Sequence, residues 1–181
     1  MKNAESKFGI RPEKIFLVGD SAGGNLVSAC TIMAINRGFR VPDGILMAYP
    51  ALSLSKLRFT PSILLSVDDQ LLPYPFLKMC LDSYCGQFTQ GDKNCDPSLQ
   101  QYLSPGVAKD AVLARFPPTR IMIAQNDALR DESLQFSLRL AKLDVDVQLK
   151  EYSYMPHGFL NYNAPILGMR DEANETIHQC A

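Results

Sequence analysis

The sequence predicts an α/β protein with a mainly parallel sheet, and three observations lead to that prediction. Short apolar runs bounded by glycine or proline have the length of buried strands. Amphipathic stretches with helical spacing lie between them. Strands and helices alternate along the chain, which implies βαβ units with right-handed crossovers. At 181 residues the chain is long enough for one domain with a sizeable core.

Four segments are predicted to be strands. The first three are compact apolar runs, as expected of strands that are buried on both faces. In the fourth segment the side chains alternate, with Val145, Val147, Leu149 and Glu151 on one face, and this alternation indicates a strand nearer the edge of the sheet. The predicted strands are Ile15–Val18, Gly44–Tyr49, Thr119–Ala124 and Val145–Tyr152.

Helical spacing marks four further segments, and the polar start of the chain, Met1–Phe8, is expected to end a helix. The four segments are Gly23–Asn36, Pro75–Cys85, Asp131–Leu143 and Met169–Cys180. The apolar face of the first is formed by Leu26, Ala29, Cys30 and Met33. The third is expected to turn Leu134, Leu138 and Ala141 inward. The polar stretch Gly86–Pro97 is predicted to be a surface loop.

Composition and charge argue against several classes of protein. The net charge is −1 and no basic stripe is present, so nucleic acid is not an expected partner. The apolar runs are too short for a transmembrane helix, and Met1–Phe8 is too polar for a signal peptide. The five cysteines lie in no metal-ligand spacing, so we expect free thiols in a reducing, cytoplasmic setting. A Cys80–Cys85 disulfide is disfavoured because the spacing suits neighbours on one helix.

The strongest chemical signal is a G-x-S-x-G motif centred on Ser21, directly after a predicted strand and before a predicted helix. In a nucleophile elbow the serine sits on a sharp, strained turn above the sheet edge. Gly19 and Gly23 meet the need for small neighbours where strand and helix crowd together, and Gly24 relieves the crowding further. The N–H of Ala22 is placed to donate to a developing oxyanion. A chance glycine-rich turn is the competing interpretation, and no P-loop lysine follows.

Serine needs a neighbouring base, and the chain has two histidines. His157 follows the last predicted strand on a loop, whereas His178 lies in a polar stretch where a solvated role is expected. An acid that orients the imidazole should follow a strand and precede the histidine. Asp127 fits this position. Asp131 is the alternative, although a role in the first turn of the helix explains it equally well.

Three ordered motifs resemble the hormone-sensitive lipase family of α/β-hydrolases, and the flanking stretches look closest to its animal-type members. The motifs are Gly19–Asn25, Asp127–Glu132 and Pro156–Phe159, and the flanking stretches are Val41–Ile45, Ala48–Ala51 and Leu64–Pro73. The resemblance implies the α/β-hydrolase fold, with Ser21 as nucleophile, Asp127 as acid and His157 as base. Ala128 replaces the proline of the family's D-P-L-R-D pattern, which is expected to loosen the turn modestly.

Two departures from the family pattern stand out. The H-G-G-G oxyanion motif does not precede the elbow, and loss of one oxyanion donor typically costs about 10²–10³ in turnover. The link between Leu72 and Thr119 has no room for a long regulatory insertion. We therefore expect residues 1–181 to be the C-terminal part of a single catalytic domain that lacks its N-terminal strands. Alone, such a chain should expose apolar surface, aggregate readily and be weakly active.

The predicted function is hydrolysis of carboxylic esters such as acylglycerols, steryl esters or short acyl esters. The chemistry needs no cofactor and no metal. The expected partner is an ester or lipid substrate, with peripheral contact at a lipid surface, and the sequence does not indicate the oligomeric state. Apolar residues between Ala51 and Phe76 are candidates for an acyl pocket, although core packing is expected for most of them. Peptidase or thioesterase activity, or a catalytically impaired binding domain, are the alternatives.

Overall fold

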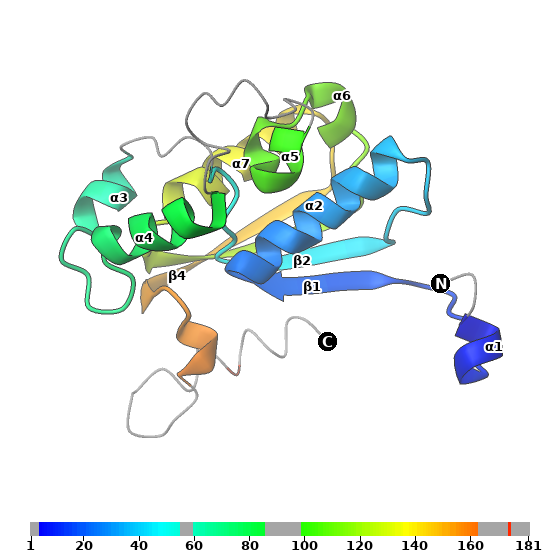
Figure 1. Cartoon of the computed structure of the whole chain (residues 1–181), viewed down its shortest axis with the longest axis horizontal. Helices are drawn as coiled ribbons and strands as arrows, with labels where there is room; N and C mark the ends of the chain where they lie inside the picture. Colours follow the sequence, from blue (N-terminus) through cyan, green and yellow to red (C-terminus); the bar gives the residue numbers. More distant parts are fainter. Residues whose placement is uncertain (1–3, 55–59, 86–98, 163–173, 175–181) are drawn as a thin grey trace.

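The computed structural model describes residues 4–54, 60–85, 99–162 and 174. Its four strands form one sheet in the order β1-β2-β3-β4, and each neighbouring pair is parallel (Figure 1). The strands are β1 (Phe16–Asp20), β2 (Gly44–Ala48), β3 (Thr119–Asn126) and β4 (Val147–Pro156). The predicted parallel α/β sheet and the edge position of the fourth strand are confirmed within these residues.

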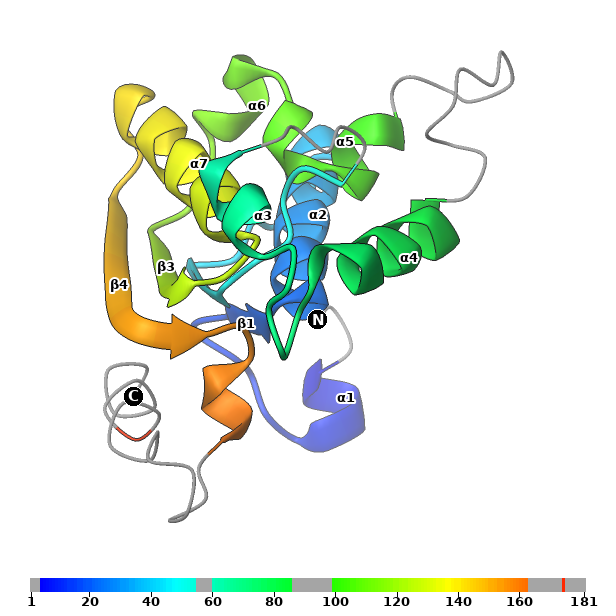
Figure 2. The same cartoon turned by 90° about the vertical axis from the view of Figure 1, so that its left-hand side faces the viewer.

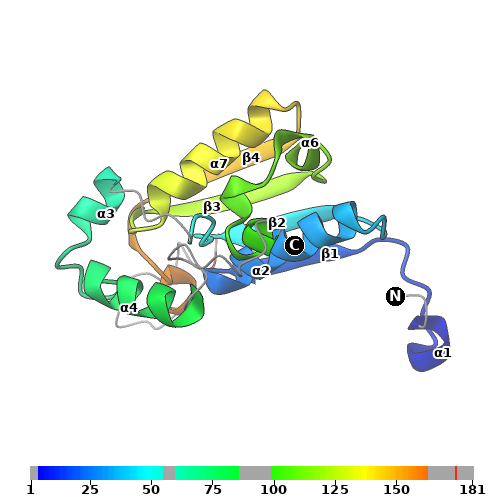
Figure 3. The same ribbon diagram turned by 45° about the horizontal axis from the view of Figure 1, so that its top comes forward.

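Two long helices cover one face of the sheet. Helix α2 (Ala22–Asn36) packs on β1 and β2, and α7 (Arg130–Lys142) packs on β3 and β4. Figures 2 and 3 show both helices on the same side of the sheet, as right-handed crossovers between strands added in order require. The other elements are α1 (Ala4–Phe8), α3 (Pro61–Leu65), α4 (Tyr74–Cys85), α5 (Gln100–Leu103), η3 (Pro105–Val107), α6 (Asp110–Leu113) and η4 (Phe159–Asn161).

The main core lies between the sheet and these two helices. Several of its members, from the sheet, from α2 and α7, from the loop after β2 and from the short helix at Leu113, expose no more than 1% of their surface: Ile32, Met47, Leu52, Leu113, Ile121, Ile123 and Leu140. Burial of large aliphatic side chains of this kind contributes about 1.5–3 kcal/mol per residue. This core holds the ends of the strands in register, and the candidate site is built on those ends.

Strand β1 differs from the prediction that it is buried on both faces. Phe16 is 62% exposed and Val18 is 65% exposed. These side chains point to the face that α2 does not cover, whereas Leu17 packs against the core. The apolar surface expected from the sequence is therefore present on this strand. Strands β2 and β3 are buried over most of their length, as predicted.

The predicted apolar face of α2 is confirmed at Ala29, which is buried, but it is wrong at Leu26 and Cys30. Leu26 is 55% exposed and Cys30 is exposed, while Val27, Thr31 and Ile32 lie against the core. The prediction fails because it takes only apolar residues as buried, so a polar residue such as Thr31 shifts the predicted buried face to another side of the helix. Thr31 satisfies its hydroxyl within the helix by donating to the carbonyl of Val27 at 2.8 Å, and it can therefore be buried.

The same error applies to α7. Leu138 is 54% exposed and Ala141 is exposed, whereas Ser133, Phe136 and Ser137 are buried. Each serine hydroxyl donates to the carbonyl four residues earlier in the helix, Ser133 to Leu129 at 3.0 Å and Ser137 to Ser133 at 2.8 Å. Small satisfied hydroxyls let α7 lie close to the sheet, which a purely apolar stripe would not indicate.

Several remaining predictions can be placed. Helix α4 confirms the predicted Pro75–Cys85, and α1 with Gly9 at φ 65° confirms the helix end near Phe8. Helix α3 falls in a stretch where no element was expected. Cys30, Cys80 and Cys85 are free thiols. The predicted loop Gly86–Pro97 and the predicted final helix lie outside the described residues, apart from Asn174.

Candidate active site

Ser21 stands on a strained turn between β1 and α2. Its backbone has φ 52° and ψ −118°, an angle pair that residues other than glycine rarely adopt. The turn is held at both ends, because the N–H of Ser21 donates to the carbonyl of Ala48 at 2.9 Å and its carbonyl accepts from the N–H of Ala51 at 3.2 Å. These backbone bonds fix the elbow to the end of β2.

The glycines around Ser21 serve different purposes. A Cβ on Gly19 would stand 2.4 Å from the carbonyl oxygen of Gly23, so no side chain fits there. A Cβ on Gly24 would stand 2.6 Å from the Cβ of Pro50. A Cβ on Gly23 would meet nothing nearer than a side-chain oxygen of Asp20 at 3.8 Å. The prediction that a side chain at position 23 would be crowded is therefore wrong. Gly19 and Gly24 are the positions that have no room for a side chain.

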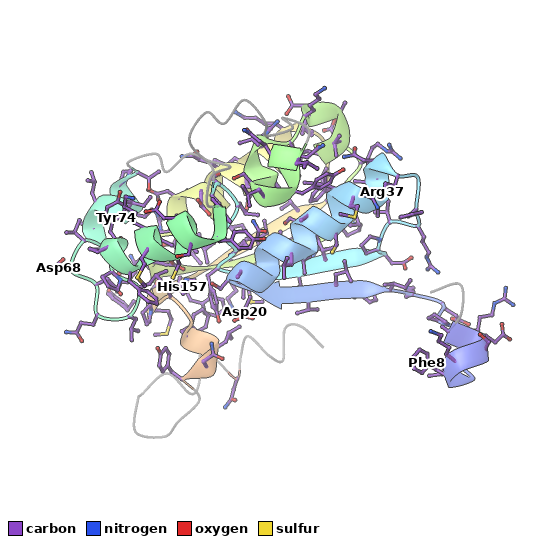
Figure 4. The ribbon with its side chains drawn as sticks, viewed as in Figure 1. Phe8, Asp20, Arg37, Asp68, Tyr74 and His157 are labelled. Carbon is purple, nitrogen blue, oxygen red and sulfur yellow. The ribbon has the colours of Figure 1, made fainter. Side chains whose placement is uncertain are left out.

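The structure brings together Ser21, His157 and Asp127. The Oγ of Ser21 lies 2.8 Å from Nε2 of His157, and Nδ1 of His157 lies 2.8 Å from Oδ2 of Asp127. The three residues follow β1, β4 and β3, whose carboxyl ends meet at one edge of the sheet. Figure 4 shows His157 and Asp20, the residue before Ser21, at this same end, opposite Arg37. A base in hydrogen-bonding range of a serine and oriented by a carboxylate can activate that serine.

Asp127 is 5% exposed, and its second carboxylate oxygen accepts from the N–H of Leu129 at 2.8 Å. Asp131 is engaged elsewhere: it pairs with Arg130 at 3.0 Å and accepts from the N–H of Ser62 at 2.9 Å. The alternative acid therefore braces the start of α7 against α3 and does not contact the imidazole.

His157 is set by the end of β4 and by aromatic packing. The register of the β3–β4 pair shifts between Ala124 and Asn126, just before the histidine, and irregularities of this kind are common beside active sites. Gly158 follows in the left-handed region at φ 75°. The ring of Tyr49 meets the imidazole edge to face. Burial, followed by the nearby Asp20 carboxylate, raises the pKa of the Tyr49 hydroxyl.

Ala22 begins α2 directly after the serine. As the first residue of the helix, its N–H has no acceptor within the helix, and it lies at the positive end of the helix dipole. A backbone N–H next to a nucleophilic serine is the kind of donor that can stabilise an oxyanion, so Ala22 remains the candidate for that role.

An apolar cavity of about 470 Å³ opens beside Ser21 and His157. Its apolar walls come mainly from α2, α4 and the loop after β2: Leu26, Ala51, Leu54, Leu71, Leu72, Phe76, Leu77, Cys80, Leu81, Tyr84 and Leu129. Of the residues proposed for an acyl pocket, Leu54 and Phe76 line it. Leu52 is fully buried in the core, and Leu64 and Leu65 are exposed on α3. Leu57 and Phe59 lie outside the described residues.

Sequence reasoning missed three residues that support the site, namely Asn25, Tyr49 and Glu132. Asn25 is buried at 2% exposure and donates from Nδ2 to the carbonyl of Ala51 at 2.8 Å. A polar residue in the first turn of an apolar helix, or a tyrosine between a strand and a proline, is a weak signal for such roles. Glu132 was hidden by its place in a charged first turn.

Comparison with known proteins agrees with this geometry. A family model described as the α/β hydrolase fold matches residues 1–161. Human hormone-sensitive lipase is 48% identical over 84 residues, which cover 46% of this chain and 8% of that protein. An esterase of Acinetobacter venetianus is 28% identical over 161 residues, which cover 86% of this chain and 48% of that protein. The predicted resemblance to hormone-sensitive lipases is confirmed.

A solved structure gives the same result. Carboxyl esterase 2 from the mycorrhizal fungus Tuber melanosporum has a TM-score of 0.78 and 27% identity. The match covers 98% of this chain and 54% of that one, so the chain spans about half the length of that enzyme. None of the helices in the described segments has the length and apolar character needed to cross a membrane. From its family match, its parallel sheet and its structural neighbour, the chain belongs to the α/β-hydrolase fold family.

Proposed function

We propose that this chain is a serine hydrolase of carboxylic esters, and that residues 1–181 form part of a single catalytic domain. The observation that carries the proposal is the unbroken hydrogen-bond chain from Ser21 through His157 to Asp127. It ends beside a cavity whose described lining residues are mostly apolar and include no lysine, arginine, aspartate or glutamate. Esterases and hormone-sensitive lipases among the relatives support the same chemistry.

The reaction proceeds in two halves. His157 accepts the Ser21 proton as Oγ attacks the ester carbonyl, and Asp127 orients the imidazole and offsets its positive charge. The tetrahedral oxyanion accepts a hydrogen bond from the N–H of Ala22. His157 then donates its proton to the departing alcohol, which leaves an acyl group on Ser21. Water, deprotonated by His157, releases the acid and restores the serine.

The cavity favours an apolar acyl group over a peptide. Peptide bonds need hydrogen-bond partners along the bound strand, and the wall formed by α4 is mostly apolar, through Phe76, Leu77 and Leu81. Acylglycerols, steryl esters and short acyl esters all offer such an acyl group. Exposed apolar side chains on α4, Phe76 at 47% and Met79 at 56%, support contact with a lipid surface beside the cavity. The free thiols of Cys30 and Cys80 support a cytoplasmic location.

A fluorophosphonate probe tests the proposal on the full chain. The wild type should be labelled once, at Ser21, and should hydrolyse p-nitrophenyl esters. Ser21→Ala should lose both the label and the hydrolysis, while a folded Ser83→Ala variant on α4 should retain them. A wild-type chain that is folded but neither labelled nor active would leave the alternative of a binding domain. Hydrolysis that persists in Ser21→Ala would remove the serine from the mechanism.

A further inference from the structure

The loop that follows β2, residues 50–54, is fastened to three elements. From α2, Asn25 donates to the carbonyl of Ala51 at 2.8 Å. From α7, the hydroxyl of Ser133 lies 3.1 Å from the carbonyl oxygen of Pro50, and it shares its proton between this carbonyl and that of Leu129. From η3, the N–H of Gly106 donates to the carbonyl of Leu52 at 2.7 Å. These contacts hold the carbonyl side of the loop.

A single carboxylate holds the opposite side. Oε1 of Glu132, on α7, accepts from the N–H of Leu52 at 2.5 Å, and the N–H of Ser53 also donates to this carboxylate. The Glu132 side chain is partly buried, and this burial is the largest influence on its carboxylate, raising its pKa from 4.5 to about 7. An apolar residue at this position would avoid the desolvation cost of the carboxylate, but it would leave the N–H groups of Leu52 and Ser53 without this acceptor.

The loop joins the two ends of the site. The N–H of Ala51 binds the carbonyl of Ser21 at 3.2 Å, so the loop contacts the nucleophile's own backbone. Glu132 lies five residues after Asp127, at the start of the helix that follows the acid. Ala51 and Leu54 are also walls of the apolar cavity. Glu132 therefore connects the helix of the acid, the turn of the serine and one wall of the cavity.

We propose that Glu132 is a positioning residue, which sets the spacing between Ser21 and Asp127 and holds the cavity wall formed by the loop. The inference rests on the hydrolase function proposed above and adds a residue that does not touch the substrate. Both backbone N–H groups need an acceptor when they are buried, and a carboxylate satisfies two donors at once. Without it the loop would lose two bonds on one side and shift relative to the serine.

Charged groups around Glu132 are few in the described part of the chain. The negative charge of Asp127 also raises the pKa of Glu132. Arg139 lines the same small cavity of about 230 Å³, but it is bound to Asp110 and to the carbonyls of Gly106 and Ala108. The structure gives no ion pair to Glu132 among the residues it describes. Its state of charge therefore follows the pH around neutrality.

The test compares Glu132→Ala, Glu132→Gln and a matched control, Glu151→Gln. The control removes a carboxylate that also ties α7, through Arg130 at 2.9 Å, but that does not touch the loop. Active sites are counted with a fluorophosphonate probe, and kcat and KM are measured per active site on p-nitrophenyl acetate and octanoate. Counting sites separates positioning from a loss of folded protein.

We expect Glu132→Ala to lower kcat per active site by about ten-fold or more, since small displacements of reacting groups are costly. Its KM should rise more for octanoate than for acetate, because the cavity wall moves. Glu132→Gln should recover part of both, since its carbonyl oxygen replaces one acceptor. Because glutamine does not titrate, the octanoate KM of Glu132→Gln should change less between pH 6 and 8 than the octanoate KM of the wild type. Unchanged constants per active site in Glu132→Ala would overturn the inference.

Amide exchange separates failure of this inference from failure of the hydrolase function. If the wild type is folded but neither labelled nor active, the function fails. Exchange at Leu52 and Ser53 still reports on the loop. Glu132→Ala should accelerate it at least ten-fold, and Glu151→Gln should not. Protection that stays equal to the wild type would show that Glu132 does not hold the loop. If Glu132→Ala does not fold, the same comparison is made with Glu132→Gln.

Discussion

The ring of Tyr49 meets the imidazole of His157 edge to face, with centroids 4.9 Å apart and planes at 60°. Tyr49 is 1% exposed and has a positive φ of 36°, so its place is fixed by packing. Its hydroxyl lies near the Leu160 backbone and the Asp20 carboxylate, but it has no hydrogen bond of good geometry to any residue that the structure describes. The ring, rather than the hydroxyl, is therefore the part that supports the histidine.

Substitutions at Tyr49 should separate these two parts. Tyr49→Phe keeps the ring and removes a buried hydroxyl that makes no hydrogen bond of good geometry, so activity should be retained and stability should change by about 1 kcal/mol or less. Tyr49→Ala removes support from His157 and leaves a cavity, with an expected loss of about 3–5 kcal/mol in the free energy of unfolding. Urea unfolding and turnover per active site measure the two effects. Equal losses in both variants would assign the role to the hydroxyl.

The two aspartates near the start of α7 offer a matched pair. Asp127→Asn keeps the shape of the side chain but cannot stabilise a charged imidazole, so kcat should fall by about 10⁴. Asp131→Asn removes the ion pair with Arg130 but keeps an oxygen that can accept from Ser62, and both contacts lie away from the imidazole, so kcat should change by less than about ten-fold. Steady-state kinetics on a p-nitrophenyl ester compares them. A larger loss from Asp131→Asn would reverse the assignment of the acid.

The neighbouring glycines of the elbow should respond in opposite directions. Gly24→Ala places a Cβ 2.6 Å from the Cβ of Pro50, which should destabilise the fold by about 1–3 kcal/mol. Gly23→Ala meets only a side-chain oxygen at 3.8 Å, and alanine favours a helix by about 1 kcal/mol over glycine. Thermal unfolding of both variants checks this order. A stable Gly24→Ala variant would contradict the crowding between α2 and the loop.

The cavity next to Ser21 can be filled from α2. Leu26 is 55% exposed and lines the cavity, so Leu26→Trp should raise KM for octanoate several-fold and leave KM for acetate nearly unchanged. Leu138 is 54% exposed on α7 and does not line the cavity, so Leu138→Trp is a control of equal exposure. If both variants alter KM equally, the acyl group does not occupy this cavity.

Stability should depend on pH through Glu132. Its pKa is about 7 in the folded chain and near 4.5 when unfolded, because burial disfavours the carboxylate. As pH rises, the unfolded chain loses the proton first, so the contribution to stability is full below about pH 4.5 and is lost through pH 7. The free energy of unfolding of the wild type relative to Glu132→Gln should therefore fall by roughly 3 kcal/mol over that range. Urea titrations at several pH values measure it, and a flat difference would contradict a buried carboxylate.

Much of the fold follows from local patterns. Short apolar runs predict the buried strands. The glycines on both sides of Ser21 predict the tight turn, because a crowded backbone leaves no room for side chains. The three site residues could be proposed because each lies just after a strand, and parallel strands end at the same edge of a sheet. Their catalytic roles stay a prediction that the variants above can test.

Side-chain burial on helices was harder to predict. Ser133, Ser137 and Thr31 are buried because each donates its hydroxyl to a carbonyl within its own helix, and no apolar pattern records that. The exposure of Val18 depends on which face of β1 carries a helix, which is a property of the assembled sheet. The contact of Glu132 with the loop could not be predicted from local patterns either, because its partner Leu52 lies 80 positions away in the chain.

Ser21 and His157 stand 136 positions apart along the chain, yet their side chains touch. Closing a contact over such a long segment is slow compared with forming a helix, and it requires that β1 through β4 already be in register. Ser21 can thus be activated by His157 only in molecules in which β1 through β4 have already paired. A probe that labels Ser21 would therefore measure the yield of finished folding, and its rate of appearance after dilution from denaturant would time the last strand to join.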